Sequence, residues 1–112
     1  MKIDVTRTFT TLNGKEIKNE EGEIVTLRSI IANSLLAQYQ DETNLSGEEK
    51  VKRWKLAQTV YADDIVNLST EDIVLIKKLV GKSMVTLIAA QAWEMLESPV
   101  LKLAAEPTES NQ

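Results

Sequence analysis

The stretch from Val66 to Leu96 constrains the fold most, because it is the most apolar part of the chain and its one clear break is Gly81. On both sides of this glycine, apolar residues recur at intervals of three and four, which is the spacing of one face of an α-helix. Ser69 and Ser83 stand where helix N-caps are expected, and Gly81 stands where a C′ glycine would end a helix. We therefore expect two core helices joined at Gly81, with the rest of the chain packed around them.

Two further helices are expected earlier in the chain. Thr26 is a candidate N-cap for the first, because apolar residues at helical spacing follow it directly. Ser46 and Glu49 match a capping box, so the second helix is expected to begin there and to run to about Ala62. Leu56 is placed on its flank. The predicted inward face of the second helix consists of Val51, Trp54, Ala57, Val60 and Tyr61.

The first 25 residues indicate a small antiparallel β-hairpin. Ile3, Val5 and Phe9 fall on alternate positions between polar residues, as in a strand with one buried face. Asn13-Gly14 then suits a two-residue turn, because both residues tolerate a positive φ. The expected fold class is α+β and mainly helical, with four main helices and this N-terminal hairpin.

A chain of 112 residues fits one domain. We expect a single globular domain over residues 1–99, with the hairpin region at 1–25 and the helical region at 26–98. Residues 100–112 are expected to form a C-terminal tail that is disordered at its end, because the sequence becomes polar after Pro107.

Composition argues against several kinds of chemistry. The sequence contains no cysteine and no histidine, which removes disulfides, thiolate metal sites, the commonest general base and histidine-activated nucleophiles. The net charge is −4, which disfavours general nucleic-acid binding. No apolar run is long enough for a membrane span, and the N-terminus does not resemble a secretory signal. We expect a cytoplasmic protein that is not an enzyme and that has no cofactor, no metal site and no membrane partner.

The adjacent acids Asp63 and Asp64, with Asn67 nearby, are the one candidate for a hard-cation site. Their spacing does not match an EF-hand loop, which needs alternating oxygen ligands, a central glycine and a final glutamate. A solvated helix end explains the pair better.

A basic cluster lies early in the second helix and consists of Lys50, Lys52, Arg53 and Lys55 around Trp54. Basic groups of this kind could contact phosphate, and an indole could stack on a base. The alternative is an amphipathic helix with Trp54 inward and the cations in water. We favour the alternative, because Trp54 fits the apolar stripe and the chain is acidic. A nucleic-acid-associated regulatory protein that uses Lys50 to Lys55 remains the second functional hypothesis.

Trp93 lies off the main apolar stripe of the last helix. If it is exposed, it is a candidate anchor for a partner protein, because tryptophan is enriched at binding hot spots. It could equally cover the hairpin within the monomer. Leu101 and Leu103 follow Pro99 and could dock on another protein or on a second copy of the chain. These three residues are the candidate partner-binding residues.

The N-terminal third resembles small proteins of tailed phages and prophages. The resemblance rests on Ile3-Asp4-Val5-Thr6-Arg7, on Leu12-Asn13-Gly14-Lys15, and on Ile24-Val25-Thr26-Leu27-Arg28. A short strand, a turn and this entry into a helix are similar to the opening of phage tail assembly chaperones. The resemblance implies a non-enzymatic protein in the host cytoplasm that binds virion components such as the tape measure or tail tube subunits. It assigns no functional residue. We therefore expect a protein–protein interaction module that acts as a phage or prophage assembly factor.

Overall fold

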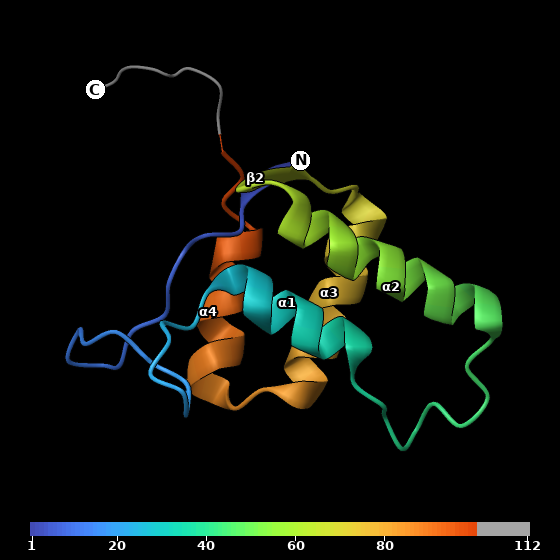
Figure 1. Cartoon of the computed structure of the whole chain (residues 1–112), viewed down its shortest axis with the longest axis horizontal. Helices are drawn as coiled ribbons and strands as arrows, with labels where there is room; N and C mark the ends of the chain where they lie inside the picture. Colours follow the sequence, from blue (N-terminus) through green and yellow to red (C-terminus); the bar gives the residue numbers. More distant parts are fainter. Residues whose placement is uncertain (101–112) are drawn as a thin grey trace.

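The structure is a computed structural model that describes residues 1–100, and it confirms a mainly helical α+β fold (Figure 1). The expectation for the end of the tail concerns residues outside this range. In chain order the elements are β1 (Lys2–Asp4), α1 (Leu27–Leu36), α2 (Gly47–Ala62), β2 (Ile65–Asn67), α3 (Thr70–Ser83) and α4 (Thr86–Leu96).

Three of the helices begin at the predicted N-caps. The side chains of Thr26, Ser46 and Ser69 each accept a hydrogen bond from the backbone N–H three residues later. Thr26 and Ser69 form complete capping boxes, whereas Ser46 forms only half of one. The predicted return bond from Glu49 is wrong, because its carboxylate turns toward Arg53 instead, at 3.5 Å from Nε.

The predicted break at Gly81 is wrong, because α3 continues through it to Ser83. The helix ends at Met84, whose extended backbone still donates its N–H to the Val80 carbonyl, so no left-handed glycine is needed. Ser83 is not the cap of α4. Its hydroxyl donates to the Leu79 carbonyl at 2.9 Å and lies 3.0 Å from the buried Ser34 hydroxyl, and α4 begins after Val85 without a side-chain cap.

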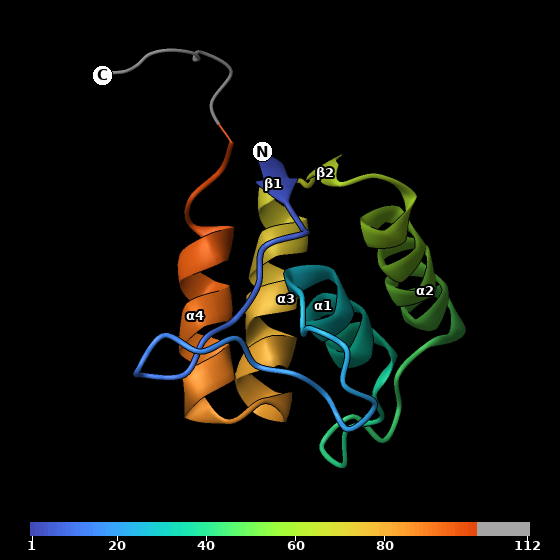
Figure 2. The same ribbon diagram turned by 60° about the vertical axis from the view of Figure 1, so that its left-hand side comes forward.

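The long-range partner of the first strand was not predicted. β1 pairs antiparallel with β2, with Ile3 opposite Val66. A turn forms here, but the predicted two-residue turn at Asn13-Gly14 is wrong. The Thr11 N–H donates to the Lys15 carbonyl and the Gly14 N–H donates to the Thr11 carbonyl, so the loop spans residues 12–14, and only Gly14 has a positive φ, +85°. On either side of this loop, residues 8–10, 16–18 and 24–26 pair through isolated bridges. Figure 2 shows this N-terminal segment crossing the side of α3 and α4, where the Gln91 side chain forms two hydrogen bonds with the backbone of Thr10.

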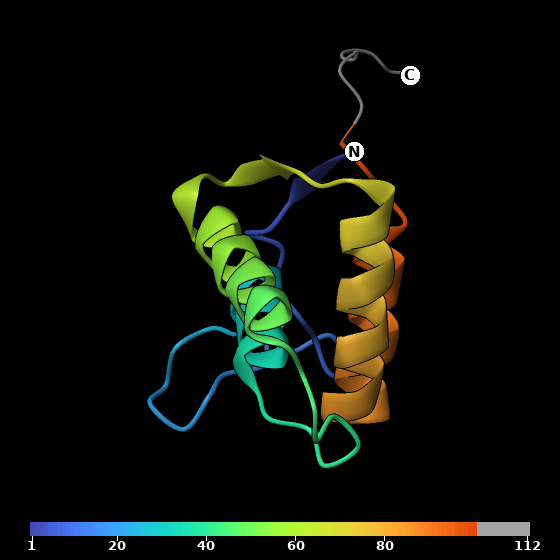
Figure 3. The ribbon, with the colours of Figure 1, turned by 90° about the vertical axis from the view of Figure 1, so that its right-hand side faces the viewer.

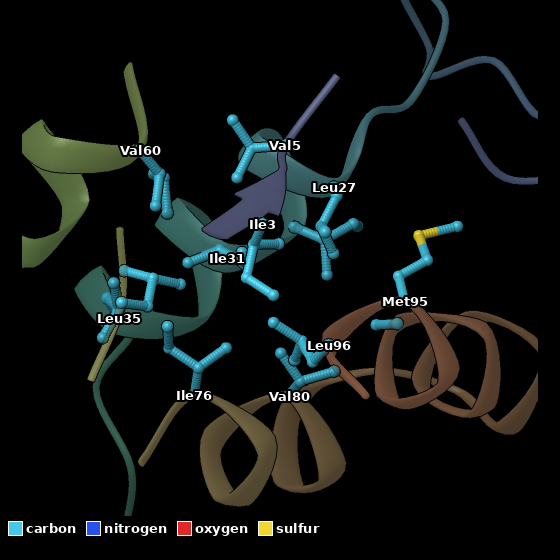
Figure 4. Close-up of a cluster of buried hydrophobic side chains, with 14 of the residues drawn as sticks. Ile3, Val5, Leu27, Ile31, Leu35, Val60, Ile76, Val80, Met95 and Leu96 are labelled. Carbon is cyan, nitrogen blue, oxygen red and sulfur yellow. The ribbon is translucent and has the colours of Figure 1, made fainter. Parts of the chain in front are cut away.

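The core lies where α1, α3 and α4 meet the N-terminal segment, and α1 also packs on α2. Figure 4 shows Ile3 and Ile31 directed into the space between the helices, toward Ile76, Val80 and Leu96. Ile3, Ile31, Ile76, Val80 and Leu96 are fully buried. Burying side chains of this size stabilises the fold by about 1.5–3 kcal/mol each.

The predicted inward face of α2 is largely wrong. Leu56 is buried with Ala57 and Val60, whereas Trp54 is 52% exposed. Val51 and Tyr61 are exposed as well. The reason is that α2 carries apolar residues on two sides, and packing against α1 selects the side with Leu56. The other side faces outward.

Candidate functional site: the surface around Trp93

Trp93 lies on α4 against the last turns of α3. Its indole N–H donates to the carbonyl oxygen of Lys77 at 3.0 Å, and the ring edge lies beside Gly81, where an added Cβ would be 3.8 Å from the ring. The side chain therefore contacts α3 and not the N-terminal hairpin. It nevertheless remains 41% exposed. Trp93 is both packed within the chain and available at its surface.

Lys77 holds the indole from a second direction. Its ammonium lies 5.3 Å from the ring centroid, within the range of a cation–π contact, and donates to Glu97 at 2.7 Å. A hydrogen bond and a cation together restrict the rotamers of Trp93. A side chain that is already ordered loses less entropy when a partner covers it, which favours its use as an anchor.

Beside the indole is a shallow hollow of about 430 Å³, which we call the Trp93 hollow. Its lining residues carry no charge, and several are small, so another chain can approach the backbone closely. The lining residues are Gly81, Met84, Thr86, Ala89, Ala90 and Trp93. Val85, in the connection between α3 and α4, is 71% exposed next to two of them in sequence. This arrangement is suited to receive an apolar side chain.

Leu101 and Leu103, the other candidate partner-binding residues, lie outside residues 1–100, so the Trp93 hollow stands without them. The last described residue, Val100, donates its N–H to the Lys2 carbonyl at 2.7 Å. Val100 therefore lies beside β1.

The basic cluster on α2 is only partly at the surface. Lys50, Lys52 and Lys55 are exposed, but Arg53 is 4% exposed and forms two hydrogen bonds with the Glu42 carboxylate at 2.8 and 2.7 Å. Arg53 as a nucleic-acid contact is therefore wrong, because its guanidinium is occupied inside the fold. Sequence reasoning also missed that Trp54 points outward, although the two apolar sides of α2 are visible in the sequence.

The acids at the end of α2 serve the fold. Asp63 is the C-cap of α2, and Asp64 pairs with Arg28 at 3.2 Å. Asn67 accepts a hydrogen bond from the N-terminal amine. Within residues 1–100 there is no cluster of three acidic residues that could hold a metal ion, and no helix in that range has the length and apolarity needed to cross a membrane.

A scan against protein-family models, a search of curated proteins and a search of solved structures found no match for this chain.

Proposed function

We propose that this chain is a non-enzymatic protein–protein interaction module whose Trp93 hollow binds an apolar side chain of its partner. The observation that carries the proposal is the indole of Trp93, which is held by Lys77 yet 41% exposed at the edge of an uncharged hollow. Tryptophans that fill or border apolar pockets supply much of the binding energy at protein interfaces. The absence of histidine and cysteine from the sequence is consistent with a binding role.

The partner class follows from the resemblance of the N-terminal third to phage tail assembly chaperones. We propose a phage or prophage assembly factor that acts in the host cytoplasm and binds a virion component, such as a tape measure or tail tube subunit. The genes beside the one encoding this chain should then encode tail proteins. Their products, co-expressed with this chain, are the partners to test first.

Replacing Trp93 by alanine is expected to raise the dissociation constant of such a complex by about 30-fold, equivalent to about 2 kcal/mol at a hot spot. Ala90→Glu places a charge in the Trp93 hollow from an exposed position and should have a comparable effect. Trp54→Ala is the matched control, because Trp54 is similarly exposed on α2. Calorimetric titration of the purified partners measures all three. Unchanged affinity in both Trp93→Ala and Ala90→Glu would contradict the proposal.

A second candidate function is nucleic-acid binding by α2, and the exposure of Trp54 beside Lys50 and Lys55 is the observation that favours it. With three lysines on phosphates, the affinity for a single-stranded oligonucleotide should fall with salt at a log–log slope of about −2. Fluorescence anisotropy in about 20 mM salt is the most sensitive condition, because screening is weak there. No binding at that salt concentration would remove this candidate.

A further inference from the structure

The loop of residues 12–14 is held together by Thr11. The Thr11 N–H donates to the Lys15 carbonyl at 2.8 Å, and the Thr11 carbonyl accepts from the Gly14 N–H at 3.0 Å. The Thr11 hydroxyl accepts from the Lys15 N–H at 3.2 Å and donates to Oδ1 of Asn13. Figure 1 shows this loop as the blue projection at the left, and Figure 3 shows the opposite side of the molecule, with α2 nearest the viewer. The loop is therefore ordered although its tip is exposed.

Two groups of this loop are placed to react with each other. The side-chain carbonyl of Asn13 and the backbone N–H of Gly14 are both directed toward Thr11, so the reacting carbon, Cγ of Asn13, and the Gly14 nitrogen lie on the same side of the loop. Holding two reacting groups together removes part of the entropy cost of joining them. Glycine carries no side chain that would obstruct the approach. The space around Gly14 is open, because an added Cβ would meet no atom within 4 Å, so water and hydroxide reach the site.

The hydroxyl of Thr11 contacts the oxygen on which charge would develop. Attack of the Gly14 nitrogen on Cγ of Asn13 places negative charge on Oδ1, and the Thr11 hydroxyl already donates a hydrogen bond to that oxygen. A donor that is in place before the reaction stabilises the charge without having to reorganise, which lowers the barrier.

We propose that Asn13 is a site of spontaneous modification, at which its side chain closes to a succinimide that water opens to aspartate or isoaspartate. The Gly14 nitrogen gives its proton to hydroxide and forms a bond to Cγ of Asn13. The bond from Cγ to Nδ2 breaks, and the leaving nitrogen takes a proton from water and departs as ammonia. Water then adds to either carbonyl of the ring. Opening on the Cγ side gives aspartate, and opening on the main-chain side gives isoaspartate.

The other asparagines of the described residues are held in ways that disfavour this reaction. Asn33 lies within α1 and Asn67 within β2, so the amide nitrogen after each is committed to a helix or to the β1–β2 ladder. Oδ1 of Asn19 accepts from two backbone N–H groups, at 2.9 and 3.0 Å, and Asn44 is followed by a leucine. Asn13 is the one asparagine in the sequence that glycine follows, and the single turn bond of its neighbour lies in a short exposed loop that can open locally.

The products change the loop and leave the core in place. Either product adds a negative charge to a chain whose net charge is −4. Isoaspartate also adds an atom to the main chain, so the hydrogen bond between Gly14 and Thr11 cannot keep its geometry. The side chains of Phe9 and Ile17, which hold this segment on the helices, lie outside the loop. The modified chain should therefore keep the thermal unfolding midpoint of the unmodified one.

Peptide mapping by mass spectrometry measures the conversion of each asparagine while the full chain is incubated at mildly alkaline pH. A synthetic peptide with the sequence of residues 9–17 gives the rate without the fold. Asn13 is expected to convert before Asn19 and Asn44, and its products should include isoaspartate, which direct hydrolysis of the side chain does not form. An intact Asn13 after the peptide has converted, a product that is aspartate alone, or equal conversion of Asn19 would overturn the proposal.

Replacing Thr11 tests the contribution of the loop. Thr11→Val keeps the backbone hydrogen bonds but removes the donor to Oδ1 of Asn13, so it should slow the conversion several-fold in the folded chain and change little in the peptide. Thr11→Ser keeps a hydroxyl and should restore the rate. Circular dichroism checks that both variants retain the fold. If Thr11→Val leaves the rate in the folded chain unchanged, or slows the chain and the peptide equally, the loop does not promote the reaction.

This modification is independent of the Trp93 hollow. Asn13→Gln prevents closure of the five-membered ring and leaves the hollow intact, whereas Trp93→Ala changes the hollow and leaves the loop intact. Failure of one proposal therefore does not bear on the other.

Discussion

Replacing Arg53 by methionine is expected to lower the free energy of unfolding by about 3 kcal/mol at pH 7. The Arg53 side chain is 5% exposed and forms two hydrogen bonds with the Glu42 carboxylate, whose side chain is 14% exposed. Methionine fills much of the same volume but leaves this carboxylate poorly solvated and without its cation. Breaking one side of a buried ion pair costs more than the pair contributes, because the remaining charge has lost its partner.

The unfolding free energy lost in Arg53→Met should become smaller as the pH falls. The hydrogen bonds from Arg53 hold the pKa of Glu42 below its ordinary value of 4.5, against the opposing effect of burial. Because the folded-state pKa is lowered, the stabilisation is complete above the unfolded-state pKa and is lost as pH falls through the folded-state value. In the Arg53→Met variant the lowering effect of Arg53 is gone while burial still raises the pKa of Glu42, so this carboxylate is protonated at a higher pH than in the wild type. The difference in unfolding free energy between the wild type and Arg53→Met should therefore be smaller at pH 3 than at pH 7.

Urea unfolding followed by tryptophan fluorescence at pH 7 and pH 3 measures both effects. Lys52→Met is the matched control on the same helix, because Lys52 is exposed, and its effect should stay within about 0.5 kcal/mol. The double variant with Arg53→Met and Glu42→Gln should recover much of the loss, since the more buried of the two carboxylates that contact Arg53 then carries no charge. An Arg53→Met variant as stable as the wild type at pH 7 would mean that Glu42 reaches water when its partner is removed.

The position of Arg53 also shows where prediction from sequence ends for this chain. The N-caps Thr26, Ser46 and Ser69 were predictable, because a cap depends on a hydrogen bond to a backbone N–H three residues away. The partner of Arg53 is Glu42, which lies in the loop before α2, and no local pattern connects the two residues. A basic residue beside three other basic residues was therefore assigned to the surface.

The faces of α2 were ambiguous for a related reason. Trp54 and Leu56 are two residues apart, so they lie on different sides of the helix, and periodicity supports either side as the buried one. Packing against α1 decides between them, and that contact depends on the tertiary fold. The exposed position of Trp54 could therefore be recognised only from the structure. For Trp93 the sequence left two alternatives open, exposure as an anchor for a partner and cover of the hairpin within the monomer. The side chain is partly exposed, and its contact within the chain is with α3.

The pairing of β1 with β2 also depends on the tertiary fold, so no local pattern predicts it. The alternation of Ile3 and Val5 predicted a strand, and Asn13-Gly14 predicted a turn, so the nearest partner was the segment after the turn. The partner found in the structure, residues 65–67, is more than 60 residues away in the chain. Val66 pairs there because it can enter the core opposite Ile3, which is a property of the assembled helices.

Replacing Phe9 by alanine is expected to cost about 3–4 kcal/mol of unfolding free energy and to release the N-terminal segment before the helices. Between residues 6 and 25, Phe9 is the one fully buried side chain, and Ile17 and Val25 are only partly buried beside the core. The local pairing passes through the same point, because the Ile17 N–H donates to the Phe9 carbonyl at 3.0 Å and the Val25 N–H to the Ile17 carbonyl at 2.9 Å. These bridges are short and isolated, so they depend on the buried ring to hold the segment on the helices.

Hydrogen exchange of the Ile17 and Val25 amides tests this dependence. In Phe9→Ala both amides should exchange faster than amides in the middle of α3, because a segment without its anchor opens locally. Leu12→Ala is the control within the same segment, since Leu12 is fully exposed and its removal should change neither stability nor exchange. If Phe9→Ala instead accelerates exchange equally in the segment and in α3, the N-terminal segment unfolds only together with the helices. Phe9 would then be part of one cooperative core and not a separate anchor for residues 6–25.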